Sequence, residues 1–240
     1  MIQKQDTGII TKIHKFGEQS LILDIFTTHN GIMRGMVKYA KNSKQNNLYQ
    51  IGNLTEVIWK ARLDEHLGNF TLDLIKSYSA SVINNYLYLE GLSAVMAEIS
   101  LCLPERQAFP FLFDELTTLL NNLNKDNWTA LFVIWEKRLL SELGFAMDLE
   151  KCALTGATEG LAFVSPKTAR AVTEEAAGIW KDKLLPLPRF MLEKEENTAS
   201  AEDVVLGMDL TGFFLNHYVF MGKEPAARGR FYNLLRKNLK

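Results

Sequence analysis

Cysteine is scarce in this chain, since only Cys102 and Cys152 occur among its 240 residues. Two thiols are too few for the disulfide framework of a secreted protein of this size. The first twenty residues also lack an apolar segment of signal-peptide length, because charged residues such as Lys4, Lys12 and Glu18 interrupt them. We therefore expect the protein to fold in a reducing cytoplasm.

Long apolar runs and catalytic signatures are absent as well. The most membrane-like stretch, residues 204–222, contains Asp209, Asn216 and His217, so we interpret it as a buried helix and expect no membrane partner. The sequence has no serine-nucleophile elbow, zinc-protease motif or P-loop. The four histidines are too scattered for metal-ligand spacing. A non-enzymatic protein without catalytic residues is therefore the stronger hypothesis, and an unrecognised hydrolase is the weaker one.

The first third of the chain has the pattern of short strands. Five runs rich in β-branched and aromatic residues are separated by turn residues, at 7–14, 19–27, 32–39, 54–61 and 69–76. Asn30 and Gly31 lie between the second and third runs, and both residues tolerate the positive φ of a tight hairpin. Five short strands are typical of a small barrel, and the OB fold is the commonest match for that number.

Beyond residue 80 the apolar residues recur at helical spacing. The pattern predicts helices over 81–103, 110–123, 126–144, 204–220 and 225–239. Ser200 and Asp203 resemble a capping box before the fourth of these. The sequence thus predicts an α+β protein, with a five-stranded OB-fold barrel at 1–79 and an all-helical domain at 80–240. We expect residues 145–175 to form an irregular central segment within the helical domain.

The net charge of −1 hides an uneven distribution. Residues 1–80 carry 10 basic and 7 acidic residues, residues 81–222 carry 11 and 20, and residues 223–240 carry 6 and 1. Basic ends around an acidic centre are a hint of nucleic-acid contact. The alternative is that these charges only solvate the surface.

Basic and aromatic residues gather in the second half of the predicted barrel. The candidate DNA-binding residues there are Arg34, Lys38, Tyr39, Lys41, Lys44, Trp59, Lys60 and Arg62. A site for single-stranded nucleic acid combines cations that follow the phosphates with rings on which bases stack. Tyr39 and Trp59 lie in strand-like runs, however, and the alternative is that both rings face the core.

The basic carboxyl-terminal end is a second candidate. We expect Arg228 and Arg230, together with Arg236, Lys237 and Lys240, to lie on an exposed helix face and to contribute to DNA or partner binding. The alternative is that Arg228 and Arg230 only pair with the acidic middle of the chain.

Several segments, read in order, match the pattern of one known family. They are Gly17–Ile22, Phe26–Gly31, Lys38–Ser43, Trp59–Gly68, Leu143–Phe145, Cys152–Gly156, Phe163–Pro166, Leu210–Gly212 and Pro225–Arg230. Together they span nearly the whole chain, and in this order they resemble the RecO family of bacterial DNA repair and recombination proteins.

The resemblance implies an OB-fold domain, a helical domain and binding of single- and double-stranded DNA. It further implies annealing of complementary strands and help in loading the recombinase onto single-stranded DNA, in the cytoplasm at the nucleoid. The partners that it implies are RecR, in some bacteria RecF, and the acidic C-terminal tail of single-strand-binding protein. The alternative is an adaptor of the repair machinery with little DNA binding of its own.

Two features depart from the family pattern. The turn after the third predicted strand holds one cation, Lys41, where many relatives have two arginines. Many relatives also bind zinc through two Cys-x-x-Cys pairs, whereas here Thr155 stands where the second cysteine after Cys152 would fall, and residues 170–175 contain none. Because one thiolate cannot build a tetrahedral structural site, we expect the zinc site to be lost and the protein to need no cofactor.

Overall fold

The computed structural model of the protein describes residues 1–38, 47–192 and 199–238. The chain forms two compact units, one of Met1–Leu123 with Pro225–Phe231 and one of Asn124–Glu224 with Tyr232–Lys240. The first unit therefore includes the amino-terminal strands, the helices that follow them and a short return of the chain. The domain boundary that we place after residue 79 falls within this unit and stays a prediction.

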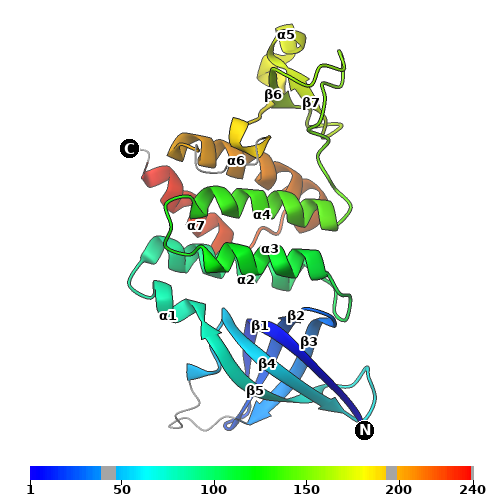
Figure 1. Ribbon diagram of the computed structural model, residues 1–240, viewed down its shortest axis with the longest axis vertical. Helices are drawn as coiled ribbons and strands as arrows, with labels where there is room; N and C mark the ends of the chain where they lie inside the picture. Colours follow the sequence, from blue (N-terminus) through cyan, green and yellow to red (C-terminus); the bar gives the residue numbers. More distant parts are fainter. Residues whose placement is uncertain (39–46, 193–198, 239–240) are drawn as a thin grey trace. The chain divides into compact units, whose positions relative to one another are not determined.

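Five strands form a closed barrel at the start of the chain (Figure 1). They are β1 (Ile2–Phe16), β2 (Ser20–Thr27), β3 (Gly31–Lys38), β4 (Asn53–Ala61) and β5 (Gly68–Ser77). Their spatial order is β1-β2-β3-β5-β4, and β4 pairs back onto β1 to close the barrel. The β3–β5 pair is parallel and the other pairs are antiparallel. This five-stranded barrel confirms the predicted OB fold.

The β2–β3 hairpin forms where the sequence predicts it. Gly31 has a φ of +66°, which glycine adopts without strain. The Asp6 carboxylate of β1 accepts hydrogen bonds from the backbone N–H groups of Thr7 (2.8 Å) and His29 (3.0 Å) and from Asn30 Nδ2 (2.7 Å). Burial alone would raise the pKa of Asp6, but these hydrogen bonds outweigh it and lower that pKa. Asp6 thus fastens the hairpin to β1 in its charged form.

Asp6→Ala is expected to lower the free energy of unfolding by about 1–3 kcal/mol at neutral pH, because hydrogen bonds to a buried charged group are strong. A carboxyl group with a depressed folded pKa stabilises the fold above its unfolded pKa, and this contribution is lost as the pH falls through the folded pKa. The difference between wild type and variant should therefore shrink below about pH 4. Urea unfolding at several pH values measures it, and a constant difference contradicts this role of Asp6.

The interior of the barrel is apolar and includes Trp59. Burial alternates along β4, so Val57 and Trp59 point into the barrel while Lys60 points out. Trp59 is only 1% exposed, and its Nε1 donates to the Arg34 carbonyl at 3.0 Å. The prediction that Trp59 stacks on bases is therefore wrong, and the alternative, a ring in the core, is what the structure has.

Two glycines bring β3 and β5 together. Gly35 of β3 is paired with Gly68 of β5. A Cβ atom added to Gly35 would lie 2.7 Å from the Phe70 ring, and one added to Gly68 would overlap Trp59 Nε1. Closure of the barrel therefore depends on the absence of side chains at these two positions.

Three helices follow the barrel in the first unit. They are α1 (Tyr78–Val82), α2 (Tyr86–Cys102) and α3 (Pro110–Asn121). The single helix predicted over 81–103 is interrupted before α2, where Asn84 and Asn85 favour a turn and Asn85 is extended. Phe113 of α3 packs edge-to-face on Phe26 of β2, with ring centroids 5.4 Å apart. Helix α3 is thereby attached directly to the barrel.

The second unit is built around α4 (Trp128–Glu142) and α6 (Ala201–Phe214), which pack together. The predicted capping box of Ser200 and Asp203 begins α6. Beyond Phe214 the predicted helix continues as a π-helical segment, η5 (Leu215–Phe220). The last helix, α7 (Ala226–Lys237), contributes residues to both units.

The central part of the second unit contains a small antiparallel sheet where we expected irregular structure. Its strands are β6 (Leu161–Val164), β7 (Ala171–Thr173) and β8 (Leu185–Pro186), in the order β7-β6-β8. Three short helical segments accompany it: α5 (Glu174–Ala177), η2 (Gly178–Lys183) and η3 (Arg189–Met191). Such short strands carry no readable alternation, so the sequence pattern does not predict them.

Across the described residues, no helix is long and apolar enough to span a membrane.

Candidate nucleic-acid interface

The outward-pointing side chains of β1, β2 and β3 form three rows, because residues directly opposite on paired strands share one face of a sheet. The rows are Lys12, Asp24 and Arg34, then His14, Ile22 and Met36, then Phe16, Ser20 and Lys38. We call these nine residues the outer face. Its middle row is His14, Ile22 and Met36, and the two rows on either side carry Phe16 and the cations.

Phe16 is the exposed ring of the outer face. It ends β1, its side chain is 55% exposed, and Ser20 separates it from Lys38 in the same row. An exposed ring near a cation suits a base that stacks while its phosphate meets the ammonium group. Phe16 is not among the predicted residues, because the sequence pattern predicts that the first strand ends at His14. The turn residue Gly17 is the signal that could have extended the strand to Phe16.

The Arg34 guanidinium forms ion pairs with two carboxylates, those of Asp24 and Glu105. Its guanidinium donates two hydrogen bonds to Asp24, at 2.6 and 2.8 Å, and lies 2.9 Å from a Glu105 oxygen. These hydrogen bonds to Asp24 are the main cause of a raised Arg34 pKa. Arg34 therefore neutralises the one acid of the outer face, and its capacity for a phosphate is reduced.

The other cations of this surface are exposed and available. Lys12 and Lys38 on the outer face, Lys60 near the end of β4 and Arg62 just beyond it have no ion-pair partner among the residues that the structure describes. Lys60 points outward next to Asn69 of β5. Three of the predicted cations, Lys38, Lys60 and Arg62, are therefore exposed, and Lys12 is a further exposed cation that was not among the predicted residues.

Three of the predicted residues, Tyr39, Lys41 and Lys44, lie outside the described residues, and their part in DNA binding stays a prediction. Lys240 of the basic carboxyl-terminal end also lies outside them.

Two of the predicted residues belong to α7 and form ion pairs. Arg228 is 3% exposed, and its Nε lies 3.4 Å from a carboxylate oxygen of the buried Glu98. Arg230 pairs with Glu90 at 2.9 Å while its side chain remains half-exposed. The expectation that Arg228 lies on an exposed helix face is therefore wrong, because the buried carboxylate of Glu98 needs a compensating charge. A contact of Arg230 with DNA stays a prediction.

Cys152 lies beside threonines in the second unit. Its buried sulfur accepts a hydrogen bond from the Thr173 backbone N–H at 3.5 Å and lies 3.8 Å from Thr173 Oγ1. Burial raises the pKa of the thiol, but hydrogen bonds from Thr155, Thr173 and Leu154 outweigh it and lower this pKa from 9.0 to about 6. Within the described ranges no three His, Cys, Asp or Glu side chains gather as metal ligands. One sulfur among hydroxyl groups does not fit the zinc ion that the family resemblance implies.

Elemental analysis of the purified protein is expected to find no stoichiometric zinc, because the segment around Cys152 is held by packing and hydrogen bonds. A strong chelator should accordingly leave the thermal unfolding temperature unchanged, since a structural zinc site would couple metal loss to unfolding. Bound zinc at one ion per chain, or a chelator-induced fall in that temperature, contradicts the loss of the site.

Comparisons with known proteins agree with this architecture. Residues 1–78 match the family model described as Recombination protein O N terminal, and residues 83–225 match Recombination protein O C terminal. A protein named DNA repair protein RecO from Cereibacter sphaeroides (strain ATCC 17029 / ATH 2.4.9) is 41% identical over 239 residues, which cover 98% of this chain and 99% of that protein. Proteins of the same name from Jannaschia sp. (strain CCS1) and Bartonella quintana (strain Toulouse) are 39% and 38% identical, over 97% and 98% of this chain and 96% and 98% of their own lengths. The chain therefore belongs to the RecO family of DNA repair proteins.

Proposed function

We propose that this protein is a non-enzymatic mediator of DNA repair and recombination that binds single- and double-stranded DNA and promotes strand annealing. In this role it helps to load the recombinase onto single-stranded DNA at the nucleoid, together with RecR. RecF and the acidic C-terminal tail of single-strand-binding protein are the further partners in the proposal.

The observation that carries the proposal is the outer face of the barrel. OB folds bind oligonucleotides on the face formed by their second and third strands and on the neighbouring loops. Here β1 extends that face with the exposed Phe16 and with Lys12, and β3 contributes Lys38. Neither lysine has an ion-pair partner among the described residues, and Arg34 cancels the charge of Asp24. Bases of a single strand can lie on the apolar middle of the face while its phosphates follow Lys12 and Lys38. Double-stranded DNA, whose bases are stacked inside, would be held through its phosphates alone.

A salt titration of fluorescently labelled single-stranded DNA tests the proposal. The logarithm of the binding constant should fall linearly with the logarithm of salt concentration, because each neutralised phosphate releases counterions. With the four cations Lys12, Lys38, Lys60 and Arg62 in contact with phosphates, the slope is expected to be about −3. Negligible binding at low salt would instead support the adaptor without DNA binding of its own. An annealing assay with complementary strands then separates a mediator from a passive binder.

A further inference from the structure

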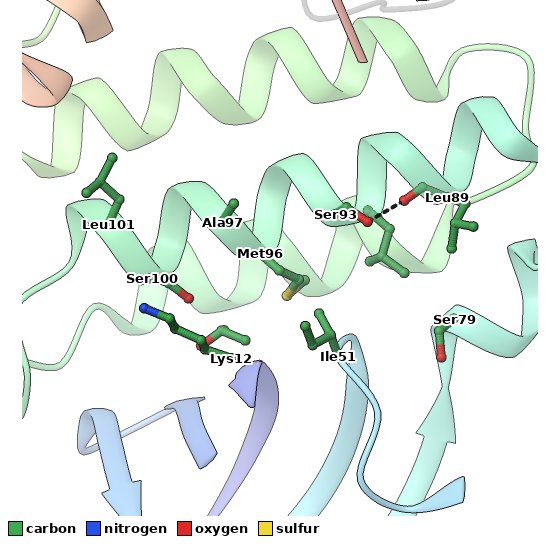
Figure 2. Close-up of a pocket in the computed structure, with 11 residues that line it drawn as sticks. Lys12, Ile51, Ser79, Leu89, Ser93, Met96, Ala97, Ser100 and Leu101 are labelled. Carbon is green, nitrogen blue, oxygen red and sulfur yellow. Dashed lines mark hydrogen bonds between the residues drawn. The ribbon is translucent and has the colours of Figure 1, made fainter. Parts of the chain in front are cut away.

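The outer face has a neighbour in residues 103–109, which join α2 to α3 and which we call the connecting segment. Figure 2 shows Ser100 and Leu101, near the end of α2, lining a pocket together with Lys12 of β1. Helix α2 therefore ends beside the row of the outer face to which Lys12 belongs, and the connecting segment begins there.

The backbone of the connecting segment is fixed to β3. Glu105 forms a parallel β-bridge with Ile32, and the backbone N–H of Arg106 donates to the Ile32 carbonyl at 3.0 Å. Gly31 makes room for this approach, because a Cβ atom added to it would lie 2.1 Å from the Gln107 carbonyl oxygen. The segment thus packs backbone against backbone on the start of β3.

The Arg106 side chain holds the connecting segment at a second place. Its guanidinium lies 3.7 Å from an Asp64 oxygen and donates to the His66 carbonyl at 3.4 Å. Both partners belong to the loop between β4 and β5, one of the loops with which OB folds bind oligonucleotides. Arg106 has a φ of +63°, which residues with a side chain rarely adopt, so these contacts on both sides must hold it there.

Glu105 is the acid that this anchoring presents to the outer face. Its carboxylate lies 2.9 Å from Arg34 Nη1, whereas Asp24 accepts hydrogen bonds from Nε and Nη2 of the same guanidinium. The Asp24 side chain is 4% exposed and belongs to the fold, but that of Glu105 is 46% exposed. A phosphate oxygen would meet Nη1 at a similar distance. Glu105 therefore occupies the place that a DNA phosphate would take at Arg34.

We propose that Glu105 is a built-in competitor of DNA, which withholds Arg34 from phosphates and thereby keeps DNA binding weak enough for release. An exposed ion pair is only weakly stabilising, so the competition lowers the affinity without abolishing it. A mediator that hands a strand to other proteins has to release that strand. The inference rests on the DNA binding of the proposed function and adds the residue that limits its affinity.

Fluorescence anisotropy of the full-length protein with a fluorescein-labelled oligothymidine tests the competitor. Glu105→Gln keeps the size of the side chain and the backbone contacts of the connecting segment, and it removes the charge. Binding should tighten about twofold to fivefold at low salt, which is the range that exposed ion pairs span. The salt slope should become steeper by about 0.7, because Arg34 then contacts a phosphate as a fifth cation. Release of the labelled strand into excess unlabelled oligothymidine should also be slower.

Two controls separate occupation of Arg34 from a general effect of charge. Glu115→Gln in α3 removes the same charge at an exposed site and should leave the affinity and the slope unchanged. The second control is a background with Asp24→Asn and Arg34→Gln together, which removes the ion pair without leaving a buried charge alone. In that background Glu105→Gln should change binding little, because no guanidinium remains to be freed.

The outcomes distinguish the inference from the proposed function. Equal affinity and slope in the wild type and Glu105→Gln, an equal gain in Glu115→Gln, or an undiminished gain in the background without Arg34 overturns the inference and leaves DNA binding intact. Binding by Glu105→Gln but not by the wild type supports the competitor. If neither protein binds the oligonucleotide, the proposed DNA binding is refuted and the inference with it.

Discussion

Gly68→Ala is expected to destabilise the protein by about 3 kcal/mol or more, at the upper end of what overpacking costs. The new Cβ would overlap Trp59 Nε1, which is fixed because it donates to the Arg34 carbonyl at 3.0 Å. Trp59 is buried in the barrel core and has no space into which to move. Chemical denaturation followed by circular dichroism measures the change.

Two controls show whether the contact with Trp59 is the cause. Gly229→Ala in α7 introduces a Cβ that meets nothing within 4 Å and should stabilise the helix by up to about 1 kcal/mol. Trp59→Phe removes the indole nitrogen, so Gly68→Ala should cost less in the Trp59→Phe background than in the wild type. Strictly additive effects of the two substitutions would show that Gly68 is required for another reason.

Phe16→Ala is expected to weaken binding of single-stranded DNA about tenfold to a hundredfold, since a base stacked on an aromatic side chain is worth about 1–3 kcal/mol. The salt slope should not change, because no charge is lost. Replacing Lys12, Lys38 and Lys60 with alanine together should also weaken binding, but by reducing the slope by about 2. Anisotropy titrations at several salt concentrations distinguish these two effects.

The matched control for the lysine variant removes the same charge from the second unit. Lys151, Lys167 and Lys223 are exposed there, and their joint replacement with alanine should leave the salt slope nearly unaltered. If both triple variants reduce the slope equally, the effect comes from net charge and the outer face is not the DNA path.

The barrel strands and the longer helices could be predicted from this sequence, because apolar residues recur along it at strand or helix spacing. The five barrel strands, the Asn30–Gly31 turn and the capping box of Ser200 and Asp203 depend on interactions within a few residues. The three short strands between Leu161 and Pro186 could not be predicted, because strands of four residues or fewer do not establish an alternation.

The site was less predictable because it depends on strand register and on distant partners. Trp59 and Phe16 both lie in strands, yet one ring is enclosed by the barrel and the other is exposed on its surface. Only the pairing of neighbouring strands decides which ring is exposed. Similarly, no local pattern shows that Arg228 faces Glu98 from a remote part of the chain.

Residues 225–231 belong to the first unit, although they are synthesised after residues 124–224 of the second unit. A ribosome makes the barrel and α2 early, but it must complete residues 124–224 before the segment with Arg228 emerges. Until then Glu98 lacks the guanidinium that faces it in the finished unit. A nascent chain stopped before residue 225 should consequently remain sensitive to protease around α2, although its barrel strands are all present. Folding of the first unit can thus be completed only after residues 124–224 of the second unit have been translated.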